Sequence, residues 1–323
     1  MIPLLIDSDC GIDDAVGVWW AALRDDVDLL AATSVWGNVD EQIAARNLCR
    51  VLHLAGRPGV PVAIGAGEPF GPAPDLIPAA FIHGSDGVGD TGRPPAPFGP
   101  VEATAVDLLR RTIDERPGEV VVVTLGPLTN LAHVVTADPT WATRVRRLVV
   151  MGGAIVSQGN AMPVGEANIA HDPHAAQTAL SAAWTTPPLL VGLDVTQTAR
   201  LHDEDVDLAL EGRTPAAADL GEMLVYYRRF GGAFCPDGEF PSHDALAVMA
   251  AVLPGIVTGP VLPVAVETHP GPAQGMTVAD RRQPFFERNG GAQNLPDGFH
   301  PVEVGLDVDA ARFRAEVRWL FGA

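Results

Sequence analysis

An apolar run that ends abruptly in acidic residues, close to the amino terminus, constrains the fold more than any other stretch of the chain. Residues 4–6 have the composition of a buried strand, Gly11 permits a sharp turn, and an apolar helical segment follows. Four carboxylates fall within this short stretch: Asp7, Asp9, Asp13 and Asp14. Because like charges at such separations repel one another, the stretch predicts a site where a cation or a proton neutralises them.

Helix capping is the alternative explanation for part of this cluster. Asp is common at helix N-termini, where it accepts hydrogen bonds from unpaired backbone N–H groups and interacts favourably with the helix dipole. Capping accounts for Asp13 or Asp14, but it does not also explain Asp9 at the end of a strand. The pattern therefore favours a functional site.

The rest of the sequence indicates an α/β fold with a mostly parallel central sheet flanked by helices, similar to a Rossmann fold. Hydrophobic residues make up 47% of the 323 positions, and several short Val/Ile/Leu runs lack polar alternation, as buried parallel strands do. Segments 14–23, 27–36 and 40–55 predict a helix, a strand and a helix. We expect a helix over 101–115 and a long loop over 65–100. No linker or repeat divides the chain, so residues 1–323 are predicted to form a single domain.

Charge and composition limit the classes of binding partner and of chemistry that we expect. The formal net charge of −19 argues against a nucleic-acid polymer or an anionic membrane and favours a small neutral or cationic substrate. All basic side chains are Arg, which excludes chemistry that needs a lysine amine. Cys10, Cys49 and Cys235 form neither a disulfide framework nor a zinc motif. With no basic leader and no apolar run of membrane-spanning length, we expect a cytoplasmic protein.

Three further groups of polar residues are candidates for the site. His83 lies in a glycine-rich part of the long loop, where a lid residue and a solvated histidine are equally compatible with the pattern. The amides and carboxylate of Asn160, Glu166 and Asn168 suit sugar hydroxyls, although such residues are also common in turns and on surfaces. His243 precedes Asp244 at a predicted helix start, where Asp244 could be a cap and His243 a proton donor.

With these residues in place, the chain resembles the nucleoside hydrolases, the inosine-uridine-preferring nucleoside N-ribohydrolase family, over nearly its whole length. The resemblance rests on stretches that follow one another in order: 7–15, 36–38, 125–130, 151–153, 166–169, 192–196, 243–244 and 275–280. Each stretch alone would be a weak signal, whereas the ordered series argues against chance. Two residues depart from the family pattern, because Cys10 stands where proline is usual and Ala167 where some relatives have an aromatic residue.

The resemblance implies a Ca²⁺ ion held by Asp9, Asp14, Asp244 and the backbone carbonyl of Leu125. It implies that Asp9 is the general base, that His243 is the acid that assists the departing base, and that Asn168 belongs to the same machinery. The substrate contacts expected with them are Asp13, Asn38 and Asn168 for the 2′- and 3′-hydroxyls, Asn160 and Glu166 for the 5′-hydroxyl, and Met151 and His83. Further contacts to the base could come from Phe234, Phe240, Tyr226 or Tyr227.

The implied activity is Ca²⁺-dependent hydrolysis of the N-glycosidic bond of purine or pyrimidine ribonucleosides, in nucleoside catabolism or salvage. The same resemblance suggests a homodimer or homotetramer. Two other interpretations stay open at this point. Asp7 and Asp9 after a first strand also resemble the nucleophile motif of haloacid-dehalogenase phosphatases, although those enzymes usually need a lysine that this chain lacks. A nucleoside- or ribose-binding protein without turnover would use the same polar residues.

Overall fold

A ten-stranded sheet forms the centre of the protein. The computed structural model describes all residues except 78, 213–214, 235–238, 283–294 and 323. In the described chain the strands lie in the order β12-β11-β13-β7-β6-β5-β1-β2-β3-β4. Their bounds are β1 Ile2–Ser8, β2 Val27–Ser34, β3 Val62–Ile64, β4 Val101–Thr104, β5 Val121–Thr124, β6 Arg147–Met151, β7 Leu189–Val191, β11 Val261–Val266, β12 Thr277–Ala279 and β13 His300–Val304.

All strand pairs from β13 across the sheet to β4 are parallel, and β11 pairs antiparallel with β12 and β13. The prediction of a mostly parallel sheet is therefore confirmed. Two two-stranded ladders lie outside it, β8 (Arg200–His202) with β9 (Glu239–Pro241) and β10 (Val257–Thr258) with β14 (Asp307–Val308). No helix in the described ranges is both long and apolar enough to cross a membrane.

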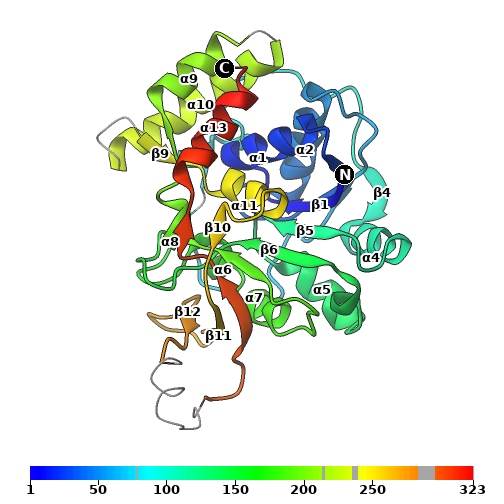
Figure 1. The fold of residues 1–323 in the computed structure, drawn as a ribbon. Coiled ribbons are helices and arrows are strands. Elements are labelled where there is room, and N and C mark those ends of the chain that lie inside the picture. The colour runs from blue at the N-terminus through cyan, green and yellow to red at the C-terminus, as the bar shows by residue number, and fades with distance from the viewer. Residues whose placement is uncertain (78, 213–214, 235–238, 283–294, 323) are drawn as a thin grey trace.

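Helices cover both faces of the sheet (Figure 1). One face carries α1 (Ile12–Leu23), α2 (Glu41–Leu54) and α11 (His243–Val252), and the other carries α4 (Ala105–Glu115), α5 (Thr129–Ala137) and α7 (Pro173–Leu180). The other helices of the described residues are η1 Trp141–Arg144, α3 Ala80–His83, α6 Ala167–His171, α8 Leu193–Thr196, α9 Asp203–Leu210, α10 Pro215–Phe234 and α13 Ala310–Leu320.

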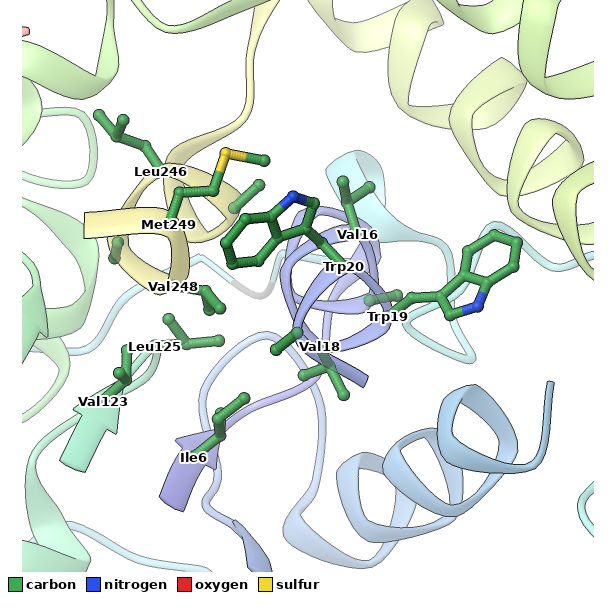
Figure 2. Packing of buried hydrophobic residues seen from close by; sticks show 14 of the residues in the cluster. Ile6, Val16, Val18, Trp19, Trp20, Val123, Leu125, Leu246, Val248 and Met249 are labelled. Atoms are coloured by element: carbon green, nitrogen blue, oxygen red, sulfur yellow. The ribbon is translucent and has the colours of Figure 1, made fainter. Parts of the chain in front are cut away.

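Successive residues of the central strands face opposite layers, which explains why those strands are apolar throughout. In β1, Leu4 and Ile6 pack into the layer of α1 and α11, whereas Leu5 packs into the layer of α4 and α5. Figure 2 shows the first layer, where Ile6 lies below the side chains of α1 and Trp20 of α1 lies beside Met249 of α11. The helices α1 and α11 pack against each other, and α11 also contacts β5 and β6. Their N-termini meet at the carboxyl edge of the sheet, where they bring Asp13, Asp14 and Asp244 together.

One predicted element needs correction. The helix expected over 101–115 begins only at Ala105, because Thr104 caps it by accepting a hydrogen bond from the Asp107 backbone N–H at 3.2 Å. The four residues before it form the edge strand β4, which pairs with β3. The loop expected over 65–100 is mostly irregular, but it contains the short helix α3, which ends at His83.

Candidate active site

The acidic residues of the amino-terminal stretch lie where ligands of parallel sheets bind, at the carboxyl ends of adjacent strands. Asp9 follows β1, Leu125 follows β5, and Met151 ends β6, and these three strands are neighbours in the sheet. The turn into α1 is tight. Cys10 in it has a φ of 37°, which the ring of a proline would not allow.

Three carboxylates form a compact buried group. One oxygen each of Asp13, Asp14 and Asp244 lie within 4.8 Å of one another. Asp14 is held by the Ser8 hydroxyl at 2.6 Å and the Gly11 backbone N–H at 2.9 Å, while Oδ1 of Asp244 is buried with no hydrogen-bond partner in the described chain. Burial, followed by repulsion from Asp13, raises the pKa of Asp14 to about 7. Burial and then repulsion from Asp14 raise the pKa of Asp244 well above its ordinary value.

This donor set fits a hard cation. An unpartnered buried carboxylate oxygen beside two further carboxylates is costly unless a positive charge offsets it, and oxygen ligands are those that Ca²⁺ prefers. Of the predicted metal ligands, Asp14 and Asp244 belong to the compact group. Asp13, expected at the ribose, is its third member in place of Asp9.

Asp9 adjoins this group and is held rigidly. The backbone N–H and the side-chain amide of Asn38 donate to its two oxygens at 2.8 and 3.1 Å. Gly37 and Gly126 leave the space that Asp9 occupies, since a Cβ atom on Gly37 would lie 2.1 Å from Oδ2. Burial and then repulsion from Asp14 raise the pKa of Asp9 well above its usual range. Asp9 and Asn38 therefore lie together, as predicted residues of one site.

Asn168 joins the ends of β5 and β6 to the site. Its side-chain amide donates to the carbonyl oxygen of Leu125 at 2.8 Å and to that of Met151 at 3.1 Å. Glu166 caps α6 by accepting from the backbone N–H groups of Asn168 and Ile169, and it also accepts from that of Gly153 at 2.9 Å. The Leu125 carbonyl, a predicted metal ligand, is thus fixed by a predicted substrate-binding residue.

Asn160 lies at the exposed edge of this cluster. Its Oδ1 accepts a hydrogen bond from the Ala167 backbone N–H at 2.9 Å, which connects it to the residue after Glu166. Glu166 itself is buried, with both carboxylate oxygens engaged by backbone N–H groups, and burial raises its pKa. The three polar residues expected at the sugar are therefore one connected group.

Two imidazoles lie close enough to the acidic group to interact with it. His83 is buried and interacts electrostatically with Asp13 and His243, and its Nδ1 accepts a hydrogen bond from the Ile12 backbone N–H at 3.1 Å. The His243 backbone N–H donates to Asp13 at 3.1 Å, and its ring Nδ1 lies 2.7 Å from the hydroxyl oxygen of Thr196. Burial lowers the pKa of both rings. His83 from the glycine-rich loop and His243 from the start of α11 therefore lie in the same site.

The aromatic residues expected to contact the base lie in different parts of the structure. Tyr227 stacks on His83 with ring centroids 5.6 Å apart, and Phe240 is buried behind Tyr227. The Tyr226 hydroxyl donates to the carbonyl of Ala80 at 3.2 Å, so it ties α10 to α3. The side chain of Phe234 lies outside the described residues, and so does Cys235.

One contact of the site was not predicted. The hydroxyl of Thr196 against His243 joins α8 to α11, and no local pattern could indicate this contact because the two residues lie 47 positions apart. Asp7, in contrast, is removed from the site. It is fully buried on the opposite face of β1, where it accepts hydrogen bonds from Thr33 at 2.5 Å and Asn130 at 2.7 Å.

Fold and site together define an α/β enzyme that handles a small polar ligand at the carboxyl edge of its sheet. Residues 4–315 match the family model described as inosine-uridine preferring nucleoside hydrolase. Uridine nucleosidase 1 of Arabidopsis thaliana is 35% identical over 309 residues, which cover 95% of this chain and 89% of that protein. The pyrimidine-specific ribonucleoside hydrolase RihA of Citrobacter koseri is 35% identical over 287 residues, covering 86% and 88%.

Solved structures agree with the sequence relatives. The plant nucleoside hydrolase PpNRh1 superposes with a TM-score of 0.91 at 31% identity, covering 100% of this chain and 99% of that one. The purine-preferring ribonucleoside hydrolase from Gardnerella vaginalis gives a TM-score of 0.87 at 30% identity, covering 99% and 98%. The chain belongs to the inosine-uridine preferring nucleoside hydrolase family, as the sequence resemblance predicted.

Proposed function

We propose that this protein hydrolyses the N-glycosidic bond of ribonucleosides in a Ca²⁺-dependent reaction and releases ribose and the free base. The observation that carries the metal requirement is the buried group of Asp13, Asp14 and Asp244 with its unpartnered carboxylate oxygen. Asp14, Asp244, Asp9 and the Leu125 carbonyl would hold the ion. When bound, Ca²⁺ would offset the carboxylate charges and help to orient a water molecule for attack.

The residues of this chain then have distinct tasks. Asp9, held by Asn38, accepts the proton of the attacking water as general base. Asp13, Asn38 and Asn168 bind the 2′- and 3′-hydroxyls, while Asn160 and Glu166 face the 5′ end, because carboxylate and amide groups satisfy hydroxyls that both donate and accept. As the bond breaks, the ribosyl centre gains positive character, which the nearby carboxylates stabilise.

Pyrimidine ribonucleosides are the substrates that we propose first. The names of the relatives point to uridine and other pyrimidine nucleosides. His83 and His243 offer polar ring nitrogens for the carbonyl and ring-nitrogen acceptors of such a base. By resemblance we also propose a cytoplasmic homodimer or homotetramer.

The phosphatase alternative lacks an accessible nucleophile. In that interpretation Asp7 would attack phosphate, but Asp7 has no exposed surface and lies in the layer of α5, away from the carboxylate group. The interpretation as a binding protein predicts intact nucleoside after incubation, so the same assay tests it.

The decisive experiment measures reducing sugar released from uridine, cytidine, inosine and adenosine, with Ca²⁺ and after chelation. We expect turnover with Ca²⁺, strongest for a pyrimidine nucleoside, and its loss on chelation. The Asp9→Ala variant should be inactive, whereas Asp25→Ala, an exposed acidic control on the turn after α1, should match the wild type. Absence of ribose from every nucleoside in the presence of Ca²⁺ would refute the proposal.

A further inference from the structure

Each imidazole of the site has its Nδ1 engaged by the protein. In His83 the partner is the backbone N–H of Ile12, at 3.1 Å. Because a backbone N–H can only donate, His83 Nδ1 must be the acceptor, and the ring proton is carried by Nε2. Stacking on Tyr227 fixes the plane of this ring, so the direction of its N–H is fixed as well.

His243 has a hydroxyl in the corresponding place. Thr196 ends α8 and is fully buried, and its Oγ1 lies 2.7 Å from His243 Nδ1. Among the described residues the Thr196 hydroxyl has no other hydrogen-bond partner. If Nδ1 carried the proton and donated to Oγ1, the hydroxyl hydrogen would be buried without an acceptor, which is unfavourable. The arrangement that satisfies both groups has Thr196 donating to Nδ1.

We propose that Thr196 is a positioning residue for the leaving-group step, because its hydroxyl donates to His243 Nδ1 and thereby leaves Nε2 as the N–H directed at the departing base. Since Nδ1 and Nε2 lie on different edges of the ring, tying Nδ1 to α8 turns Nε2 away from α8. The His243 backbone N–H donates to Asp13 at 3.1 Å, which places this residue beside the acidic group. His83 and His243 then each present an Nε2–H donor.

In this arrangement His243 acts as a hydrogen-bond donor to the departing base and not as the acid expected from the sequence. This inference rests on the proposed function. As the C–N bond breaks, its electron pair moves onto the base. Two fixed N–H donors stabilise the negative charge that develops there, and the base takes its proton from water after it departs. Meanwhile the attacking water gives its proton to Asp9, so the step balances without proton transfer from either imidazole.

The test compares two variants on two substrates. Thr196→Val keeps the shape of the side chain and removes the hydroxyl, whereas Thr196→Ser keeps the hydroxyl. Uridine has a base that needs stabilisation as it departs, while 4-nitrophenyl β-ribofuranoside releases a phenolate that needs little. We expect Thr196→Val to lower kcat for uridine about 10- to 100-fold, at or below the effect of losing one preorganised donor. Its kcat for the nitrophenyl riboside should be unchanged, and Thr196→Ser should resemble the wild type on both.

Other outcomes separate the alternatives. Equal losses on both substrates would mean that Thr196 only supports the fold, and unchanged turnover of uridine by Thr196→Val would remove the role altogether. If the wild type hydrolyses neither substrate, the proposed function fails instead. Nitrogen-15 spectra of histidine-labelled wild type give a second test that requires no variant fold, with His243 assigned from its absence in His243→Gln. We expect an unprotonated Nδ1 and a protonated Nε2, and the reverse tautomer would overturn the inference.

Discussion

Asn38 holds both carboxylate oxygens of Asp9, one through its backbone N–H at 2.8 Å and the other through its side-chain amide at 3.1 Å. Such a two-point contact fixes the plane of the carboxylate. The general base that we propose acts only when its oxygen faces the attacking water, so the turn that carries Asn38 would matter for the chemistry as well as the strand that precedes Asp9.

The first prediction compares loss of the Asn38 amide with its replacement by a carboxylate. Asn38→Ala removes one hydrogen bond to Asp9 and should lower kcat/KM about 10- to 100-fold, the range found when supporting residues of a metal site are lost. Asn38→Asp is closer in shape but places another carboxylate against Asp9, so it should be worse than Asn38→Ala. Steady-state kinetics on uridine measure the order. Gln42→Ala on the exposed side of α2 is the control, and a more active Asp variant would contradict the electrostatic argument.

Space around Asp9 leads to the second prediction. Gly37 has a φ of 154°, and a Cβ atom there would lie 2.1 Å from Asp9 Oδ2. Gly271 has nearly the same φ, 156°, with nothing within 4 Å of an added Cβ. Both alanine substitutions strain the backbone by roughly 1–3 kcal/mol, but only Gly37→Ala displaces Asp9. We therefore expect a similar free energy of backbone strain in the two variants. Activity should be abolished in Gly37→Ala and retained in Gly271→Ala.

Metal removal is the subject of the third prediction. If Ca²⁺ offsets the carboxylate group, an ion at 100 times its Kd stabilises the folded protein by about 2.7 kcal/mol, which chelation would remove. Asp244→Asn takes one buried charge from the group, so it should raise the Tm of the chelated protein while abolishing the rise on adding Ca²⁺. Differential scanning fluorimetry with and without Ca²⁺ measures both. If the Tm of the wild type does not change when Ca²⁺ is added, the metal assignment is wrong.

The sequence alone predicted the local parts of this molecule well. The strand expected over 27–36 and the helix expected over 40–55 are β2 and α2, with each end within two residues of the prediction, because an apolar run and an Asp at the helix start are local signals. The first strand of the site was recognisable for the same reason. The beginning of α4 was placed too early, because residues 101–104 are edge-strand residues whose pairing with β3 is a tertiary interaction.

Distant contacts were beyond local patterns. The sequence indicated His83 and Tyr227 as separate candidates for contacts to the substrate, but their stacking depends on how α10 packs against α3. The contact between Thr196 and His243 likewise requires α8 and α11 to meet. Asp13 lies on the same helix turn as Asp14, so its membership of the compact group with Asp244 follows from the way α1 and α11 bring their N-termini together.

The fourth prediction concerns His171, the last residue of α6. Its Nδ1 lies 2.7 Å from the carbonyl oxygen of Ala167, and its ring meets the edge of Trp36 with centroids 5.4 Å apart. Burial lowers the pKa of His171 below the ordinary 6.5, so near pH 6 the unfolded chain binds a proton that the folded chain does not. The free energy of unfolding therefore falls as pH drops from above 6.5 towards the folded pKa.

In His171→Gln this contribution disappears. Urea unfolding at pH 7.5, 6.5 and 5.5 should show that the wild type loses more stability over this interval than the variant does, so that the difference between them narrows as the pH falls. Gln42→Ala is the control, because Gln42 is exposed and its side chain carries no group that titrates over this pH range. A constant difference between wild type and His171→Gln across the three pH values would show that the buried imidazole does not titrate differently in the folded protein.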